Sequence, residues 1–217
     1  MLRQAQQEGA AWQRAKARAR ILLTAALGLL VLSACYIPTR FNAQITVNAA
    51  GDWTMVYTGV LTYGALAPGL MPDRPTAAQL AERVRNVTAD LRRDPGFRDL
   101  EYLGNGAFQV DYEKSGNIYR QPGITFVRTD SRVLQIQYVG TKEEITVRGN
   151  TVPTAQRQWV RDAGLDMQGD LRVITELPVV DHNATTTGPG PNGTTIYLWQ
   201  IRGVDAQAPR LVASTAR

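Results

Sequence analysis

FNAQITVNAAGDWTMVYTGVLTY, residues 41–63, is the stretch that decides the fold. From Phe41 to Val47, apolar and polar side chains alternate one for one, which is the pattern of a strand with one buried face. A turn-forming sequence, Ala49-Ala50-Gly51-Asp52, follows, and residues 53–63 resume the alternation. The stretch therefore predicts a long antiparallel hairpin.

One face of the second predicted strand carries large side chains, most of them aromatic. They are Trp53, Met55, Tyr57, Leu61 and Tyr63. Aromatic side chains at this spacing most often fill a hydrophobic core, but they can also line a ligand pocket.

The sequence after the hairpin predicts an α+β fold, with a mainly antiparallel β-sheet and one or two packed helices, in a single domain over residues 41–217. Thr76 and Gln79 have the spacing of a capping box, and helical apolar spacing continues to Leu91. Residues 153–165 allow a second helix. The further predicted strands are 99–103, 107–113, 123–128, 132–139, 143–148, 170–177, 194–202 and 209–213.

The N-terminus has the three parts of a secretory signal. A basic stretch, an uncharged apolar run over residues 21–32 and small residues precede Cys35. Leu32-Ser33-Ala34-Cys35 resembles the lipobox of bacterial lipoproteins. The resemblance implies a signal peptide over residues 1–34 and cleavage between Ala34 and Cys35. It also implies that diacylglycerol is attached to the Cys35 sulfur. Residues 35–40 would then form a short lipidated tether that precedes the domain.

An uncleaved signal anchor is the alternative, because residues 21–37 are uncharged and could span a thinned bilayer. Both interpretations place the domain outside the cytoplasm. Tyr36 follows Cys35, where an Asp commonly retains lipoproteins at the inner membrane. Lipid anchoring at the cell membrane or the outer membrane is expected, and Tyr36 favours the outer membrane if the organism has one.

The location of the positive charge argues against a nucleic-acid partner. The net charge is +5, but the first twenty residues hold five basic residues and one acidic residue, so the remainder is close to neutral. Cys35 is the single cysteine, which excludes an intramolecular disulfide. The domain must be stabilised by its core.

No pattern of catalytic, cofactor-binding or metal-binding residues is recognisable. His182 is the only histidine and has no second histidine as a co-ligand, so we interpret it as a loop residue. Four carboxylates stand without visible pairing, although a glycosidase pair meets only in three dimensions. They are Glu113, Glu143, Glu144 and Asp162. We therefore expect no enzyme activity and no cofactor.

Two stretches together resemble the LppM-type domain of bacterial lipoproteins. The first is the lipobox followed by the strand from Phe41 and the Gly51-Asp52 turn. The second is GDLRVITELPVVDHNA, residues 169–184, followed by Tyr197-Leu198-Trp199. The resemblance implies an α+β envelope domain, and some members are thought to bind lipid-like ligands. Ala184 stands where Gly is commoner, and no functional residue is carried over.

Three functions follow as hypotheses. The first is a non-catalytic, membrane-anchored lipoprotein that binds an apolar or amphipathic envelope ligand. It is supported by the short tether, the aromatic face and the apolar residues of loop 66–71. The second is a structural or assembly lipoprotein that docks to an envelope protein. The third and least supported is a hydrolase. A cavity would favour the first, an exposed patch the second and a cleft with converging carboxylates the third.

Overall fold

The computed structural model describes residues 36–71, 73–128 and 131–216. The predicted signal peptide, residues 1–34, and the predicted acylation site, Cys35, lie outside the described residues. The described chain has an α+β fold in which strands predominate and most neighbouring strands are antiparallel, as predicted. Within those ranges, no helix combines the length and the apolar character needed to cross a membrane.

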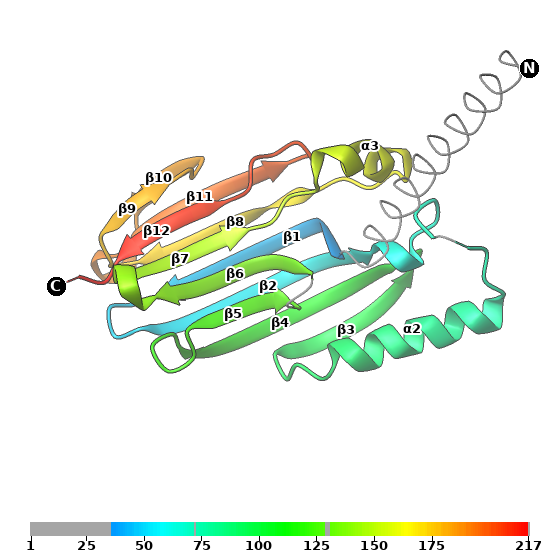
Figure 1. Cartoon of the computed structure of the whole chain (residues 1–217), viewed down its shortest axis with the longest axis horizontal. Coiled ribbons are helices and arrows are strands. Elements are labelled where there is room, and N and C mark those ends of the chain that lie inside the picture. The colour runs from blue at the N-terminus through cyan, green and yellow to red at the C-terminus, as the bar shows by residue number, and fades with distance from the viewer. Residues whose placement is uncertain (1–35, 72, 129–130, 217) are drawn as a thin grey trace, which may run out of the picture.

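The larger of the two sheets in the described chain has seven strands, with the predicted hairpin inside it (Figure 1). From edge to edge the strands are β10 (Thr186–Pro189), β11 (Thr195–Arg202), β8 (Gln168–Thr175), β1 (Tyr36–Val47), β2 (Asp52–Tyr63), β4 (Ala107–Asn117) and β3 (Phe97–Gly104). β1 pairs antiparallel with β2 and parallel with β8.

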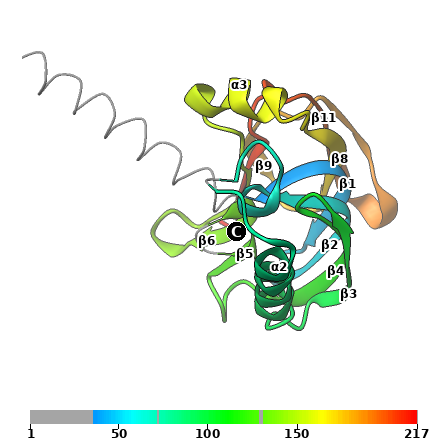
Figure 2. The ribbon, with the colours of Figure 1, turned by 90° about the vertical axis from the view of Figure 1, so that its right-hand side faces the viewer.

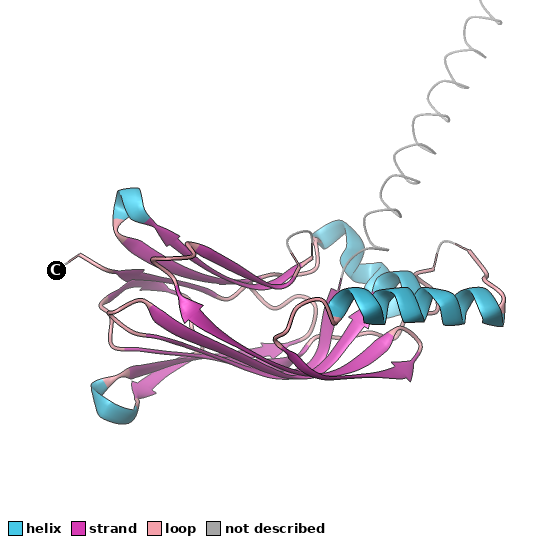
Figure 3. Ribbon diagram, turned by 90° about the horizontal axis from the view of Figure 1, so that it is seen from below, coloured by secondary structure: helices cyan, strands magenta, loops and turns pink. Residues whose placement is uncertain are grey.

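The smaller sheet has five strands in the described chain and faces the larger one (Figure 3). In spatial order they are β5 (Gly123–Val127), β6 (Arg132–Val139), β7 (Glu144–Gly149), β12 (Arg210–Ser214) and β9 (Val179–His182). The sequence pattern did not separate the strands into two sheets. The strands form two sheets because each sheet has an apolar face that needs a partner layer to cover it.

The main hydrophobic core lies between the sheets. The Tyr57 ring of β2 lies 4.7 Å from that of Phe126 of β5, and the Tyr112 ring of β4 lies 4.6 Å from it, centroid to centroid. Trp53 and Tyr57 are 3% and 0% exposed. The aromatic face of β2 therefore fills the core.

Helix α2 (Ala77–Leu91) covers the open side between β3 and β5 (Figure 2). The capping box is confirmed, because Thr76 Oγ1 accepts from Gln79 N at 3.3 Å and Gln79 Oε1 accepts from Thr76 N at 2.9 Å. Asp90 forms an ion pair with Arg128, just after β5. These contacts fix both ends of the helix.

Helix α3 (Thr154–Asp162) is shorter than predicted and lies near the beginning of β1 and the end of β11. Its Val160 side chain is fully buried. Arg157 and Arg161 both form ion pairs with Asp205, which follows β11. Short 3-10 turns occur at Gly64–Leu66, Gly140–Lys142 and Pro191–Gly193.

The segment expected as a tether has a different structure in the part that is described. Residues 36–40 form the first part of β1 and pair with the end of β2. Tyr36 and Ile37 are 8% and 3% exposed. The period-2 pattern misses this extension because Tyr36, Ile37 and Pro38 are all buried. The strand also has an irregularity between Pro38 and Arg40.

Two short strands, β9 and β10, lie where the sequence predicted loop. Both are edge strands of four residues, and most of their residues are exposed. Such strands show neither an apolar run nor alternation, so periodicity cannot detect them. His182, expected in a loop, is the last residue of β9.

Candidate functional site

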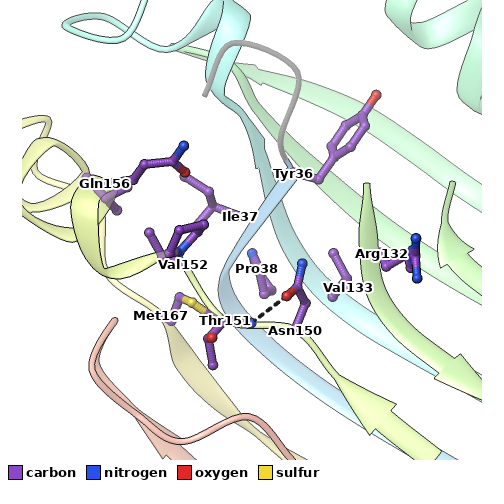
Figure 4. Close-up of a pocket in the computed structure, with 12 residues that line it drawn as sticks. Tyr36, Ile37, Pro38, Arg132, Val133, Asn150, Thr151, Val152, Gln156 and Met167 are labelled. Carbon is purple, nitrogen blue, oxygen red and sulfur yellow. Dashed lines mark hydrogen bonds between the residues drawn. The ribbon is translucent and has the colours of Figure 1, made fainter. Parts of the chain in front are cut away.

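An apolar pocket of about 100 Å³ lies at the N-terminal end of β1 (Figure 4). Side chains from five segments meet there: the start of β1, the start of β6, the loop from β7 into α3, α3 itself, and Met167 just before β8. The lining residues are Tyr36, Ile37, Pro38, Arg132, Val133, Asn150, Thr151, Val152, Pro153, Gln156, Val160 and Met167.

The loop between β7 and α3 is held in place by backbone and side-chain hydrogen bonds. Asn150 N donates to Val133 O at 3.0 Å, which ties the loop to β6. Asn150 Oδ1 accepts from Thr151 N at 2.9 Å, and Arg157 Nε donates to Val152 O at 3.1 Å. The lining of the pocket is therefore ordered by contacts that leave its apolar side chains facing inward.

A second, polar hollow of about 370 Å³ adjoins the pocket. It is lined by Arg132, Gln135, Arg148, Gly149 and Asn150. Arg132 and Asn150 line both spaces, so the apolar pocket and the polar hollow are neighbours. Together they offer an apolar compartment beside a basic one, an arrangement that suits an amphipathic molecule.

The residues of the predicted acylation site do not belong to the described chain. Cys35 and Ala34 lie outside it, but Tyr36, the next residue along, is a lining residue of the apolar pocket. Sequence reasoning missed the pocket, because its residues come from segments far apart in the chain. The only local signal was the apolar run Tyr36-Ile37-Pro38 directly after Cys35.

The apolar loop that supported ligand binding in the sequence is part of the core. Leu66 and Ala67 are each 1% exposed, and Leu70 is 6% exposed. Like the aromatic face of β2, this loop packs inward. The observation that motivates a binding site is thus the pocket at the start of β1.

His182 and two of the four carboxylates, Glu113 and Asp162, make structural contacts. His182 Nδ1 accepts from Ala184 N at 3.2 Å, and its ring lies edge-on to Tyr197 with centroids 5.0 Å apart. Glu113 pairs with Arg98 at 2.7 Å, and Asp162 accepts from Gln158 at 2.8 Å. Glu143 lies at the exposed turn before β7, and Glu144 is the half-buried first residue of β7. In the described ranges, no three His, Cys, Asp or Glu side chains form a group that could hold a metal ion.

Asn183, in the stretch that resembles the LppM-type domain, links the two sheets. Its Oδ1 accepts from Trp199 Nε1 of β11 and from Arg210 N of β12, both at 2.8 Å. Its Nδ2 donates to Ala208 O at 2.8 Å. The motif is thus a structural joint between the sheets.

The comparisons with known proteins find similarity at the level of solved structures. No family model and no curated protein matches the sequence. The fold is similar to the folded domain of LppM from Mycobacterium tuberculosis, determined by NMR. The alignment has a TM-score of 0.37 and 10% sequence identity, and covers 83% of this chain and 91% of that one.

Proposed function

We propose that this chain is a lipid-anchored protein of the bacterial cell envelope whose domain binds an acyl chain of an amphipathic envelope molecule. The observation that carries the proposal is the apolar pocket, because Tyr36, Ile37 and Pro38 of its lining directly follow the predicted acylation site. Anchor and pocket would lie at the same end of the domain.

The short distance along the chain between Cys35 and the first strand supports a position of the domain against the bilayer. Consecutive Cα atoms are about 3.8 Å apart, and Tyr36 already belongs to β1. A lipid on the Cys35 sulfur would hold the pocket at the membrane surface, where acyl chains are present at high local concentration. Stable anchoring needs more than one acyl chain, which a diacylglycerol supplies.

The volume of the pocket sets how much of a ligand it can hold. A cavity of roughly 150 Å³ binds benzene, so a pocket of about 100 Å³ takes about four carbon atoms. At roughly 0.8 kcal/mol per buried methylene, that is about 3 kcal/mol, or on the order of a hundredfold in affinity. The rest of the chain would stay in the bilayer or outside the pocket.

The chemistry of the lining favours binding over catalysis. The described lining residues include no carboxylate, imidazole or thiol that could act as an acid, base or nucleophile. The polar groups present are amides, a hydroxyl of Thr151, the phenol of Tyr36 and the guanidinium of Arg132. We therefore propose a non-catalytic role.

Docking to an envelope protein is the second candidate. It is favoured by Val180, which is 61% exposed on the edge strand β9, and by Leu103, 51% exposed on the edge strand β3. Edge strands offer unpaired backbone groups to a partner strand. Each of these apolar residues is isolated on a different sheet, so this candidate has less support than the pocket.

The anchor is tested with Cys35→Ala in the full chain, followed by fractionation of membranes and measurement of the mature mass. The variant should be released from membranes or accumulate as unprocessed precursor, because the sulfur that takes the lipid is gone. A variant that stays membrane-bound with the wild-type mature mass would show that the lipobox interpretation is wrong.

The pocket is tested by filling it. Gln156→Trp places an indole at the lining of α3, whereas Gln158→Trp puts the same side chain on an exposed face of the same helix. The full chains are purified in a mild non-ionic detergent, and lipids bound non-covalently are detected by native mass spectrometry. Lipid adducts should appear on the wild type and Gln158→Trp and be lost from Gln156→Trp. Equal adducts on both variants, or none on the wild type, would contradict acyl-chain binding in this pocket.

A further inference from the structure

Two arginines of the smaller sheet border the hollow beside the apolar pocket. Arg132 begins β6, and Arg148 lies near the end of β7, directly opposite Gln135 of β6. In a pleated sheet, residues directly opposite each other project from the same face. Arg148 and Gln135 therefore share one face, and Arg132 lines the same hollow.

The charges around Arg148 are unbalanced. Across the other neighbouring strand, Arg148 lies opposite Arg210 of β12. Like charges directly opposite each other on a sheet are destabilising. Arg210 is neutralised by an ion pair with Asp181, whereas Arg148 has no carboxylate partner among the described residues. An anion in the hollow would give Arg148 the opposite charge that Asp181 gives Arg210.

Asn150 adds a donor at the boundary between the two compartments. Its Oδ1 accepts from Thr151 N, which fixes the orientation of the amide, and its Nδ2 has no acceptor in the described chain. In the view of Figure 4, Asn150 and Arg132 lie on either side of Val133, whose side chain is apolar. Donors and apolar lining thus meet at the boundary.

We infer that Arg132 and Arg148, with Asn150, bind the anionic head group, a phosphate or a carboxylate, of the molecule whose acyl chain enters the pocket. This inference rests on the proposed function. A guanidinium presents planar, paired N–H donors that match the oxygens of phosphate and carboxylate groups. The hollow of about 370 Å³ leaves room for a head group larger than the anion itself.

The test compares two probes with the same acyl chain, 1-palmitoyl-lysophosphatidylglycerol, which is anionic, and 1-palmitoylglycerol, which is neutral. Binding of each to the full chain is measured by native mass spectrometry in a non-ionic detergent. The wild type should prefer the anionic probe by about tenfold, because charge-assisted hydrogen bonds are stronger than neutral ones. Arg148→Gln should remove most of the preference, because it should weaken binding of the anionic probe much more than binding of 1-palmitoylglycerol.

Three controls separate the outcomes. Arg172→Gln, an exposed arginine of β8, should keep the preference, and Arg148→Lys should keep part of it because the charge remains. Inorganic phosphate should compete only weakly, since it has no acyl chain. If inorganic phosphate binds as tightly as the anionic probe, the hollow is a site for free anions and the head-group assignment is wrong.

Failure of this inference differs from failure of the proposed function. Arg148→Gln could keep the full preference for the anionic probe while Gln156→Trp abolishes binding of both probes. In that case the pocket binds acyl chains, and the assignment of the hollow to a head group is wrong. If Gln156→Trp leaves binding of both probes intact, the acyl-chain pocket itself is overturned.

Discussion

Asn183 illustrates how a single polar side chain holds the two sheets together. Both of its side-chain polar atoms are used, one toward Trp199 of β11 and Arg210 of β12 and the other toward Ala208. Trp199 is 4% exposed, so its indole N–H depends on Asn183 for a partner. Loss of the amide would leave a buried donor unsatisfied.

Asn183→Ala should therefore lower the free energy of unfolding by about 2–3 kcal/mol, the cost of an unsatisfied buried group together with lost hydrogen bonds. Urea denaturation measures the change. Asn42→Ala, an exposed asparagine on β1, is the matched control and should change stability by less than about 0.5 kcal/mol. Equal effects of the two substitutions would argue against the joint.

Tyr112 is a buried phenol beside a carboxylate. Burial, reinforced by the charge of Asp94 and by the hydrogen bond from the hydroxyl to Asp94 Oδ2 at 3.3 Å, raises the pKa of Tyr112 well above its usual value. Burial likewise raises the pKa of Tyr57. In the unfolded chain both phenols would titrate near their ordinary pKa of about 10.

The unfolded chain therefore releases these protons at lower pH than the folded chain does. The contribution of the two phenols to the free energy of unfolding is fully present below pH about 10. It is lost as the pH rises above that value, by up to about 1.4 kcal/mol per pH unit for each phenol. Tyr112→Phe should make the fall between roughly pH 10 and pH 11 shallower. Urea titrations at a series of alkaline pH values measure the slope, and an unchanged slope would contradict burial of the phenol.

At the scale of elements, the main surprise is that β1 begins at Tyr36. Gly59 of β2 explains how the strand continues past its irregularity. A β-carbon there would lie 2.1 Å from Arg40 O, and the residue has φ +147°, so only glycine fits without displacing the backbone. This glycine permits the close approach that lets residues 36–38 pair with the end of β2.

Ile37→Ala tests whether this segment is strand or tether. As a buried strand residue, Ile37 should cost about 2–5 kcal/mol of unfolding free energy when truncated. Arg40→Ala, at an exposed position of the same segment, should change little. Thermal or urea unfolding distinguishes a strand from a tether. A negligible change in unfolding free energy for Ile37→Ala would show that the segment is a tether.

The elements that could be predicted were those with a local signal. The alternation of the hairpin and the capping box at Thr76 are patterns within a few residues, and β6 has the predicted bounds. The short edge strands β9 and β10 have no such signal, and neither does the assignment of strands to two sheets. The pocket could not be predicted either, because Ile37, Val133 and Val160 meet only through tertiary packing.

In the whole molecule, the anchor predicted from the sequence would directly precede the pocket, because Tyr36 of the pocket lining follows Cys35. The aromatic residues that first suggested ligand binding are in the core between the sheets, so the pocket takes over that role in the proposal. The basic hollow beside it is what makes the proposed site amphipathic. In the proposed function, an acyl chain enters the pocket while the protein is at the membrane.

Photochemical cross-linking in native membranes tests whether an acyl chain occupies the pocket. Benzoylphenylalanine is placed in the full chain at Thr151, which lines the pocket, or at Val180, which is 61% exposed on β9. After irradiation, mass spectrometry of the purified protein detects covalent lipid adducts. If an acyl chain enters the pocket, lipid adducts should form at Thr151, with few or none at Val180. Equal yields at both positions, or no lipid adduct at Thr151, would contradict acyl-chain binding in the pocket.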